Sequence, residues 1–247
     1  MYPVFLALLL SFLAGISTTL GAIIAFFIRK PSEWILGFTL GFSAGVMLNV
    51  SFVELLLKSM DLTGFLYANF AFLTGMLIIL VIDVLIPHEY IAEKANDPKL
   101  MRTGLLTATG IAIHNFPEGF VTFAGALYSI EVGFLLAMAV AIHNIPEGLS
   151  VSIPILYATG NRRKALWYSF LSGIFEPIGA VIGAAFLLPF LTDFLLGCVL
   201  AFVAGIMVYI SFDELLPSAR EYGKGHTVAM GVIFGMTVMM SSLALLR

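Results

Sequence analysis

The sequence predicts an all-α integral membrane protein with eight transmembrane helices. Of its 247 residues, 60% are hydrophobic and only 11% are charged, and the mean hydropathy is +1.05. A soluble domain carries about 25% charged residues, so this composition excludes an ordinary soluble protein. Apolar runs of about 20 residues or more, the length needed to cross a hydrocarbon core of about 30 Å, recur along the whole chain.

Helices are expected because lipid cannot hydrogen-bond an open backbone, and no alternating pattern indicates a β-barrel. The first apolar run is too long for a signal-peptide core and no basic residue precedes it, so a retained helix is expected. A polar stretch at 88–102 is expected to form a cytoplasmic loop, and residues 1–247 a single transmembrane domain. The eight runs cover residues 3–28, 34–57, 65–87, 103–127, 131–157, 167–190, 194–217 and 226–246.

The distribution of basic residues predicts the orientation. All of the Lys and Arg residues except Lys58 and Arg247 fall on one side of the eight-helix layout, and that side is expected in the cytoplasm. Both termini are then extracytoplasmic, in a multi-pass protein of the plasma (inner) membrane. The single cysteine, Cys198, allows no disulfide within the chain. A net charge of -3 spread over short loops offers no surface for nucleic acid.

Internal similarity predicts an inverted repeat. The second run matches the seventh at an offset of 160 residues, as in Gly45/Gly205 and Glu54/Glu214, and the first matches the sixth at 158, as in Gly15/Gly173. The third and eighth runs match only thinly. Five helices separate the starts of the two repeats, so helices 1–3 and 6–8 must cross the membrane in opposite senses. The fourth and fifth helices form an antiparallel pair between them, an architecture found in many secondary transporters.

The fourth and fifth runs each contain one short motif, HNFPEG at 114–119 and HNIPEG at 143–148. Ionisable residues at the bilayer centre cost roughly 2.5–3.5 kcal/mol, so they indicate function, with cations or protons as partners. In a helix the Glu side chain lies angularly between the His and the Asn of its motif. Two such helices facing each other could therefore build a two-metal site.

Neighbouring features extend the candidate site. Pro117 and Pro146 each free a backbone carbonyl in the preceding turn, and Glu176 before Pro177 in the sixth run repeats the same arrangement. Imidazole nitrogen with carboxylate and amide oxygen suits Zn²⁺, Fe²⁺, Mn²⁺, Co²⁺ or Ni²⁺ better than Cu⁺. Ca²⁺ and Mg²⁺ would not need the histidines.

The charged residues placed inside the spans are all acidic, which predicts a path for cations. Glu54 near the outer end of the second helix is expected at the entrance, and Asp213 with Glu214 near the inner end of the seventh is expected at the exit. The alternative is that these carboxylates only reach interfacial water. Asp83 and His226 are expected to be plain interfacial residues. The full set of acids is Glu54, Asp83, Glu118, Glu147, Glu176, Asp213 and Glu214.

These motifs and spans resemble the ZIP metal-ion transporters, most closely the bacterial zinc-uptake branch. The resemblance implies uptake into the cytoplasm of Zn²⁺, with Fe²⁺, Mn²⁺, Co²⁺ and Cd²⁺ as further substrates, by rigid-body movement of one helix group against the other. It also implies a homodimer, and it adds Met47 as a candidate thioether ligand. The loop between the third and fourth helices is often His-rich in relatives but has only His88 here. The implied sites are His114, Glu118, His143 and Glu147 for one metal and Asn115, Glu118, Asn144, Glu147 and Glu176 for an adjacent one.

The sequence therefore predicts a transporter and not an enzyme, with alternatives from other classes. An intramembrane metal-dependent hydrolase would use two metals to activate water. However, the chain lacks His-Glu-x-x-His, and every candidate Glu is already assigned as a ligand, which leaves no general base. A proton channel or a proton-coupled carrier of another solute would use the same acids but would not need Asn beside each His.

Overall fold

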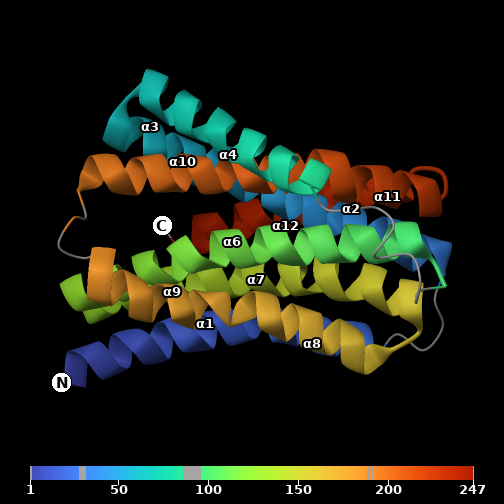
Figure 1. The fold of residues 1–247 in the computed structure, drawn as a ribbon, viewed down its shortest axis with the longest axis horizontal. Coiled ribbons are helices and arrows are strands. Elements are labelled where there is room, and N and C mark those ends of the chain that lie inside the picture. Colours follow the sequence, from blue (N-terminus) through green and yellow to red (C-terminus); the bar gives the residue numbers. More distant parts are fainter. Residues whose placement is uncertain (1, 28–31, 86–95, 188–189, 191, 247) are drawn as a thin grey trace.

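The computed structural model describes residues 2–27, 32–85, 96–187, 190 and 192–246, and its ordered structure in these ranges is helical (Figure 1). π-Helical turns connect α2 to α3 (Ser51–Leu55) and α10 to α11 (Ser211–Leu215), so each of these pairs forms one pass. With α8 and α9 also forming one pass, the described residues make the eight expected. The helices are α1 (Tyr2–Phe26), α2 (Glu33–Val50), α3 (Leu56–Thr63), α4 (Phe65–Leu85), α6 (Pro98–Tyr128), α7 (Ile130–Thr159), α8 (Arg162–Gly173), α9 (Phe175–Ile182), α10 (Asp193–Ile210), α11 (Leu216–Tyr222) and α12 (Thr227–Leu246).

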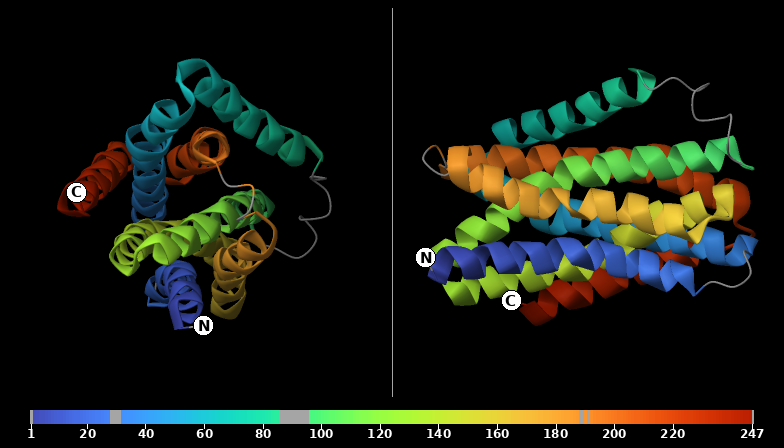
Figure 2. Two further views of the ribbon diagram at one scale, coloured as in Figure 1. Left: turned by 90° about the vertical axis from the view of Figure 1, so that its left-hand side faces the viewer. Right: turned by 60° about the horizontal axis from the view of Figure 1, so that its bottom comes forward.

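The helices form two groups that meet at the centre of the bundle. In one group α6 and α7 pack against each other and against α1, α8 and α9. In the other α2 packs against α12, and α10 packs against α4. The groups meet where α2 contacts α7 and α10 contacts α6, and Figure 2 shows α6 and α7 between α1 and the second group. The largest apolar core cluster, which includes Leu40, Met47, Ile153 and Met207, spans this junction.

Among the residues that the structure describes, seven helical segments are long and apolar enough to cross a membrane, and they do not include α6. With 31 residues α6 is long enough, but it carries His114, Asn115 and Glu118. Between residues 100 and 127, all of which the structure describes, none is exposed. A helix enclosed by other helices needs no apolar surface toward lipid, which explains why the eighth pass can be this polar.

Several helices extend beyond the apolar runs. Side-chain caps fix two of the new starts: Asp97 accepts a hydrogen bond from Leu100 N at the start of α6, and Asn161 accepts from Arg163 N and Lys164 N at the start of α8. Charged residues end an apolar run, but a capped helix can continue into water. The last part of the expected loop 88–102 is therefore helical, and its residues 88–95 lie outside the described ranges. The α2/α3 pass ends at Thr63 and not at 57, and the α10/α11 pass ends at Tyr222 and not at 217. Helix α6 starts at Pro98 and not at 103, and α8 starts at Arg162 and not at 167.

Contacts between helices follow the offset of 160 residues found in the sequence. A methyl group at Gly45 would lie 2.3 Å from the carbonyl oxygen of Val232, and one at Gly205 would lie 2.0 Å from that of Phe72. The π-helical turns at 51–55 and 211–215 also obey this offset, whereas the π-helical segment that follows α9, Gly183–Leu187, has no counterpart at it. Glu33 at the start of α2 forms an ion pair with Lys224 just after α11, so the related segments run in opposite directions. These observations support the predicted inverted repeat.

Close backbone contacts should make any substitution of Gly119 in α6 destabilising. A methyl group there would lie 1.8 Å from the carbonyl oxygen of Glu176, a backbone atom that cannot move aside. We expect Gly119→Ala to cost about 1–3 kcal/mol through overpacking and to lower the melting temperature in detergent by roughly 5 °C. The matched control is Gly110→Ala in the same helix, where the methyl group would meet only the end of the Ile210 side chain. Equal melting temperatures for the two variants would contradict the prediction.

Candidate metal centre

The two motifs face each other across the α6/α7 contact, and each His pairs with the Glu of the other motif. His114 Nε2 lies 2.9 Å from Glu147 Oε1, and His143 Nε2 lies 3.3 Å from Glu118 Oε2. All four side chains are buried. Two ligands of a tetrahedral Zn²⁺ with bonds of about 2.1 Å are roughly 3.4 Å apart. The spacing within each pair is therefore close to what a bound cation of this kind requires.

The asparagines lie beside these pairs and are held by their amide nitrogens. Asn144 Nδ2 donates to Glu176 Oε2 at 2.8 Å and to the carbonyl oxygen of Ala14 at 3.0 Å. Asn115 Nδ2 donates to the carbonyl oxygen of Ser172 at 3.1 Å. Because the nitrogens are used in this way, the amide oxygens are left to face other partners. Glu176 reaches this position from the first turn of α9, directly after the break at Ile174 that separates α8 from α9.

Several buried oxygens of this cluster have no hydrogen-bond donor in the part of the chain that the structure describes. They belong to both asparagines, to Glu147 and to Glu176. A buried acceptor without a partner costs about 1–3 kcal/mol, and a divalent cation would satisfy several of them at once. The donor set therefore fits a cation that prefers nitrogen and oxygen ligands. The atoms are Asn115 Oδ1, Asn144 Oδ1, Glu147 Oε1 and Oε2, and Glu176 Oε1.

Met47 in α2 is fully buried in the largest apolar core cluster. Its counterpart at the offset of 160, Met207, is also fully buried in that cluster. The shared environment favours a packing role for both thioethers.

A cavity of about 280 Å³ borders this centre. Glu54 and Lys58 line it at the α2/α3 end, and Glu118 and His143 line it at the centre. Most of the remaining lining residues are apolar, among them Val140, Leu200 and Met239. Glu54, which the sequence predicted at an entrance, therefore shares one cavity with two of the candidate ligands.

A second acidic cluster lies at the other end of the bundle. Carboxylate oxygens of Asp83, Asp213 and Glu214 come within 4.8 Å of one another. Arg102 bridges two of them, with Nη2 at 2.5 Å from Asp83 Oδ1 and Nη1 at 3.2 Å from Glu214 Oε1. Tyr209 OH donates to Asp83 Oδ2 at 3.2 Å and to Asp213 Oδ2 at 3.1 Å.

The expectation that Asp83 is a plain interfacial residue was wrong, because it joins this cluster. Its partners come from α6, from α10 and from the segment that connects α10 to α11, all of them distant from Asp83 in sequence. The signal that could have found it is weak: Asp83 ends an apolar run on the same side as Glu214, and Arg102 starts the next run on that side.

Comparison with known proteins identifies the family. The family model described as ZIP zinc transporter matches residues 87–243. The chain is 50% identical to the zinc transporter ZupT of Oceanobacillus iheyensis, with 98% of each chain covered. It is 49% identical to that of Streptococcus mutans, covering 98% of this chain and 97% of the relative, and 52% identical to that of Chlorobium phaeovibrioides, covering 100% and 98%.

The chain belongs to the ZIP family. This membership confirms the resemblance found in the motifs, and it makes this ZIP protein a member of a transporter family and not an enzyme. The matched region contains both motifs, Glu176, and the residues Arg102, Asp213 and Glu214 of the second acidic cluster.

Protons should compete with metal for the centre of this ZIP protein. The ligands must be neutral imidazoles and ionised carboxylates, so every proton bound to the cluster opposes the cation. We expect Zn²⁺ affinity, measured by calorimetry on purified protein in detergent, to fall as pH is lowered from 7.5 to 5.5, by roughly ten-fold per unit for each proton displaced. Titrations in two buffers of different ionisation enthalpy measure the number of protons released. An affinity that does not change with pH, with no proton release, would contradict this prediction.

Proposed function

We propose that this protein carries Zn²⁺ across the cytoplasmic membrane into the cytoplasm, with Fe²⁺, Mn²⁺, Co²⁺ and Cd²⁺ as further substrates. The observation that carries the proposal is the pair of His–Glu contacts, at 2.9 and 3.3 Å, in the interior of a membrane-spanning bundle. A cavity leads to them, and buried oxygens without donors surround them. Relatives that cover the whole chain bear the name zinc transporter, which favours Zn²⁺ among the candidates.

In this proposal the centre holds two cations side by side. His114, Glu118, His143 and Glu147 bind one, and the two asparagines with Glu176 and both motif glutamates bind the other. A carboxylate that bridges two cations offsets the charge of both, so the two cations can share their acidic ligands. The two asparagines are the feature that a simple proton path would not require.

The path in this proposal runs from Glu54 through the cavity to the centre and then to Asp213 and Glu214. In this proposal Arg102 blocks the inner end, because it lies in α6 and pairs with Asp83 on α4 and with Glu214 in the turn after α10. A cation leaving the centre would meet a positive charge there. Release therefore requires these ion pairs to separate, which a movement of the α6 group against the α4 and α10 group would accomplish.

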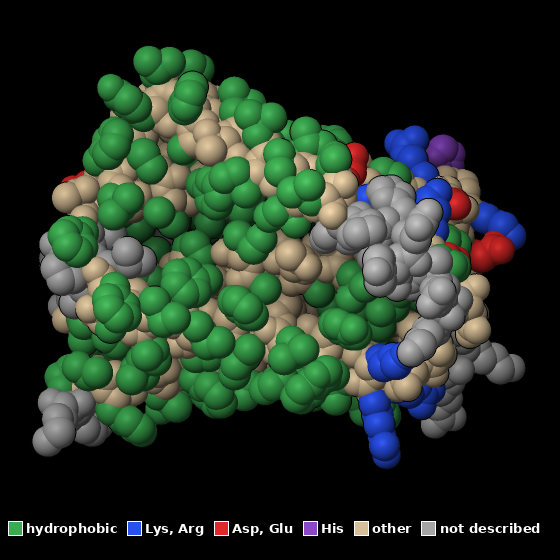
Figure 3. Space-filling view, in the orientation of Figure 1, with side chains coloured by type: hydrophobic (Ala, Val, Ile, Leu, Met, Phe, Trp, Pro, Cys, Tyr) green, Lys and Arg blue, Asp and Glu red, His purple; other side chains and the backbone are tan. Residues whose placement is uncertain are grey.

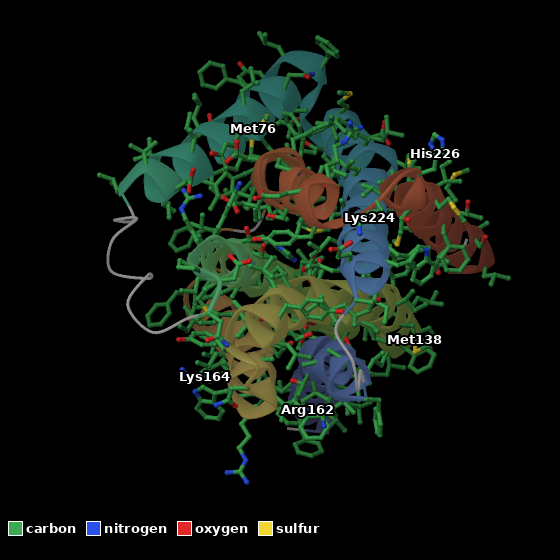
Figure 4. The ribbon with its side chains drawn as sticks, turned by 90° about the vertical axis from the view of Figure 1, so that its right-hand side faces the viewer. Met76, Met138, Arg162, Lys164, Lys224 and His226 are labelled. Carbon is green, nitrogen blue, oxygen red and sulfur yellow. The ribbon has the colours of Figure 1, made fainter. Side chains whose placement is uncertain are left out.

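The proposed orientation places the Arg102 end in the cytoplasm. Lys and Arg side chains gather at this end in Figure 3, and Figure 4 looks onto it, with Arg162, Lys164 and Lys224 labelled. Positive residues favour the cytoplasmic side. Because the first helix begins and the last helix ends at the opposite end of the bundle (Figure 1), both termini would be extracytoplasmic.

Flux of radiolabelled ⁶⁵Zn²⁺ into proteoliposomes tests the function directly. We expect saturable uptake that falls at least ten-fold in His143→Ala and Glu147→Gln, because each change removes a ligand whose loss is costly in a buried site. Glu131→Gln is the matched control, since it makes the same change at an exposed residue in the first turn of α7. Uptake that survives both ligand substitutions would refute the proposed site, and tight binding without any flux would refute transport.

The entrance role of Glu54 has its own test. We expect Glu54→Ala to lower the rate of ⁶⁵Zn²⁺ uptake several-fold at low Zn²⁺ concentration, because the cavity loses the carboxylate that attracts cations. Equilibrium Zn²⁺ binding at the centre should stay unchanged. Asp61→Ala removes an exposed carboxylate nearby in α3 and should leave uptake intact. If Glu54→Ala and Asp61→Ala transport equally fast, Glu54 is only an interfacial residue.

A further inference from the structure

The candidate centre has an approximate two-fold symmetry that exchanges its hydrogen bonds. Adding 29 to a position in α6 gives its counterpart in α7, and adding 158 to one in α1 gives its counterpart in α8 or α9. Under these offsets the bond from Asn115 to Ser172 O becomes the bond from Asn144 to Ala14 O, and both bonds are present, at 3.1 and 3.0 Å. The His114–Glu147 and Glu118–His143 pairs also exchange with each other.

The same symmetry identifies Thr18 in α1 as the counterpart of Glu176. A methyl group at Gly119 would lie 1.8 Å from the carbonyl oxygen of Glu176, and one at Gly148 would lie 1.8 Å from that of Thr18. Methyl groups at Gly15 and Gly173 would each lie 3.0 Å from a Cβ atom, that of Glu176 and that of Thr18 respectively. Four close contacts at glycines, two with carbonyl oxygens and two with Cβ atoms, thus hold the two residues in equivalent places on opposite sides of the centre.

Thr18 differs from Glu176 in length and charge, and its hydroxyl group is unused. The residue is fully buried, and Oγ1 has no hydrogen-bond partner among the described residues. The hydroxyl groups of Thr39, Thr109 and Thr159 bond to the carbonyl four residues earlier, whereas Thr18 shares its lack of a partner with the buried hydroxyl groups of Thr19, Thr107 and Thr122. Asn115, the counterpart of the asparagine that holds Glu176, also has a buried oxygen without a donor.

We propose that Thr18 is a further residue of the metal centre. Its hydroxyl group holds a water molecule, and this water binds the same cation that Glu176 binds from the opposite side. A glutamate carboxylate extends past a threonine hydroxyl by two carbon–carbon bonds, roughly 2.5 Å. One hydrogen bond to water, about 2.8 Å long, spans nearly the same distance. The water therefore stands where the symmetric carboxylate would be. This inference rests on the proposed function, because it assumes that the cluster binds a divalent cation.

Thr18 has a hydroxyl group where its counterpart Glu176 has a carboxylate, and this difference sets the charge of the centre. With Thr18 the centre contains three carboxylates, whereas full symmetry would supply a fourth. A fourth negative charge would hold two divalent cations more tightly, and a tightly held cation leaves slowly. Thr18 thus acts as a determinant of affinity that favours release over storage.

Calorimetry with Zn²⁺ on purified protein tests this role with the variants Thr18→Val, Thr18→Ser and Thr18→Glu. We expect Thr18→Val to weaken one binding step by about 10-fold or more, the usual effect of removing a group that supports a metal ligand. Thr18→Ser keeps the hydroxyl and should bind as the wild type does. Thr18→Glu should bind more tightly and release ⁶⁵Zn²⁺ from proteoliposomes more slowly. Thr39→Val, which removes a hydroxyl bonded within α2, is the control.

A spectrum of bound Co²⁺ provides a readout that does not depend on transport. Loss of the water lowers the coordination number, so the visible bands should be more intense in Thr18→Val than in Thr18→Ser. Unchanged binding and spectra in Thr18→Val, with weakened binding in Glu176→Gln, would overturn the role of Thr18 and leave the proposed function standing. If Glu176→Gln and His143→Ala also bind normally, the proposed function fails as well. Comparison with Thr18→Ser separates loss of the hydroxyl from a folding defect, because both variants change the packing at this position.

Discussion

The reciprocal pairing of two histidines with two glutamates inside the membrane is the interaction on which the rest of the structure depends. Carboxylates and imidazoles are costly in lipid, so they require partners and an enclosing shell of protein. Because α6 and α7 are antiparallel, the His that begins one motif meets the Glu that ends the other. Both pairs can form only if the two motifs lie at the same depth. This requirement determines the register of α6 against α7, and the other helices are arranged around that pair.

Close approach of the enclosing helices follows from the same constraint. Glycines in both motifs contact carbonyl oxygens of neighbouring helices, Gly119 that of Glu176 and Gly148 that of Thr18. Between apolar helices in lipid, association depends on such close packing, since no hydrophobic driving force exists there. The contacts bring α1 and α9 close enough for Ala14 O and Glu176 to bind Asn144. Close packing of the helices therefore also provides the buried polar side chains with hydrogen-bond partners.

The backbone follows the symmetry of the repeat, whereas the surroundings of its acidic side chains do not. The π-helical turns at Ser51–Leu55 and Ser211–Leu215 each carry acids: Glu54 lines a cavity, and Glu214 pairs with Arg102. π-Helical turns are often found at functional sites because the extra residue changes the direction of nearby side chains. The two turns thus share one backbone conformation, and one places its acid at a cavity while the other places its acid beside a guanidinium group.

The amino-acid sequence by itself determined the membrane-spanning class, the number of passes, the repeat and the two motifs. These follow from local properties: length, apolarity and the fixed angular positions of side chains on a helix. Helix ends were less predictable, since Asp97 and Asn161 extend α6 and α8 beyond the apolar runs. Only the tertiary structure decided that Asp83 joins Arg102 and Tyr209, and that Thr18 lies opposite Glu176. The reason is physical: these contacts depend on how helices distant in sequence pack and rotate against one another, which the periodicity of each helix alone does not specify.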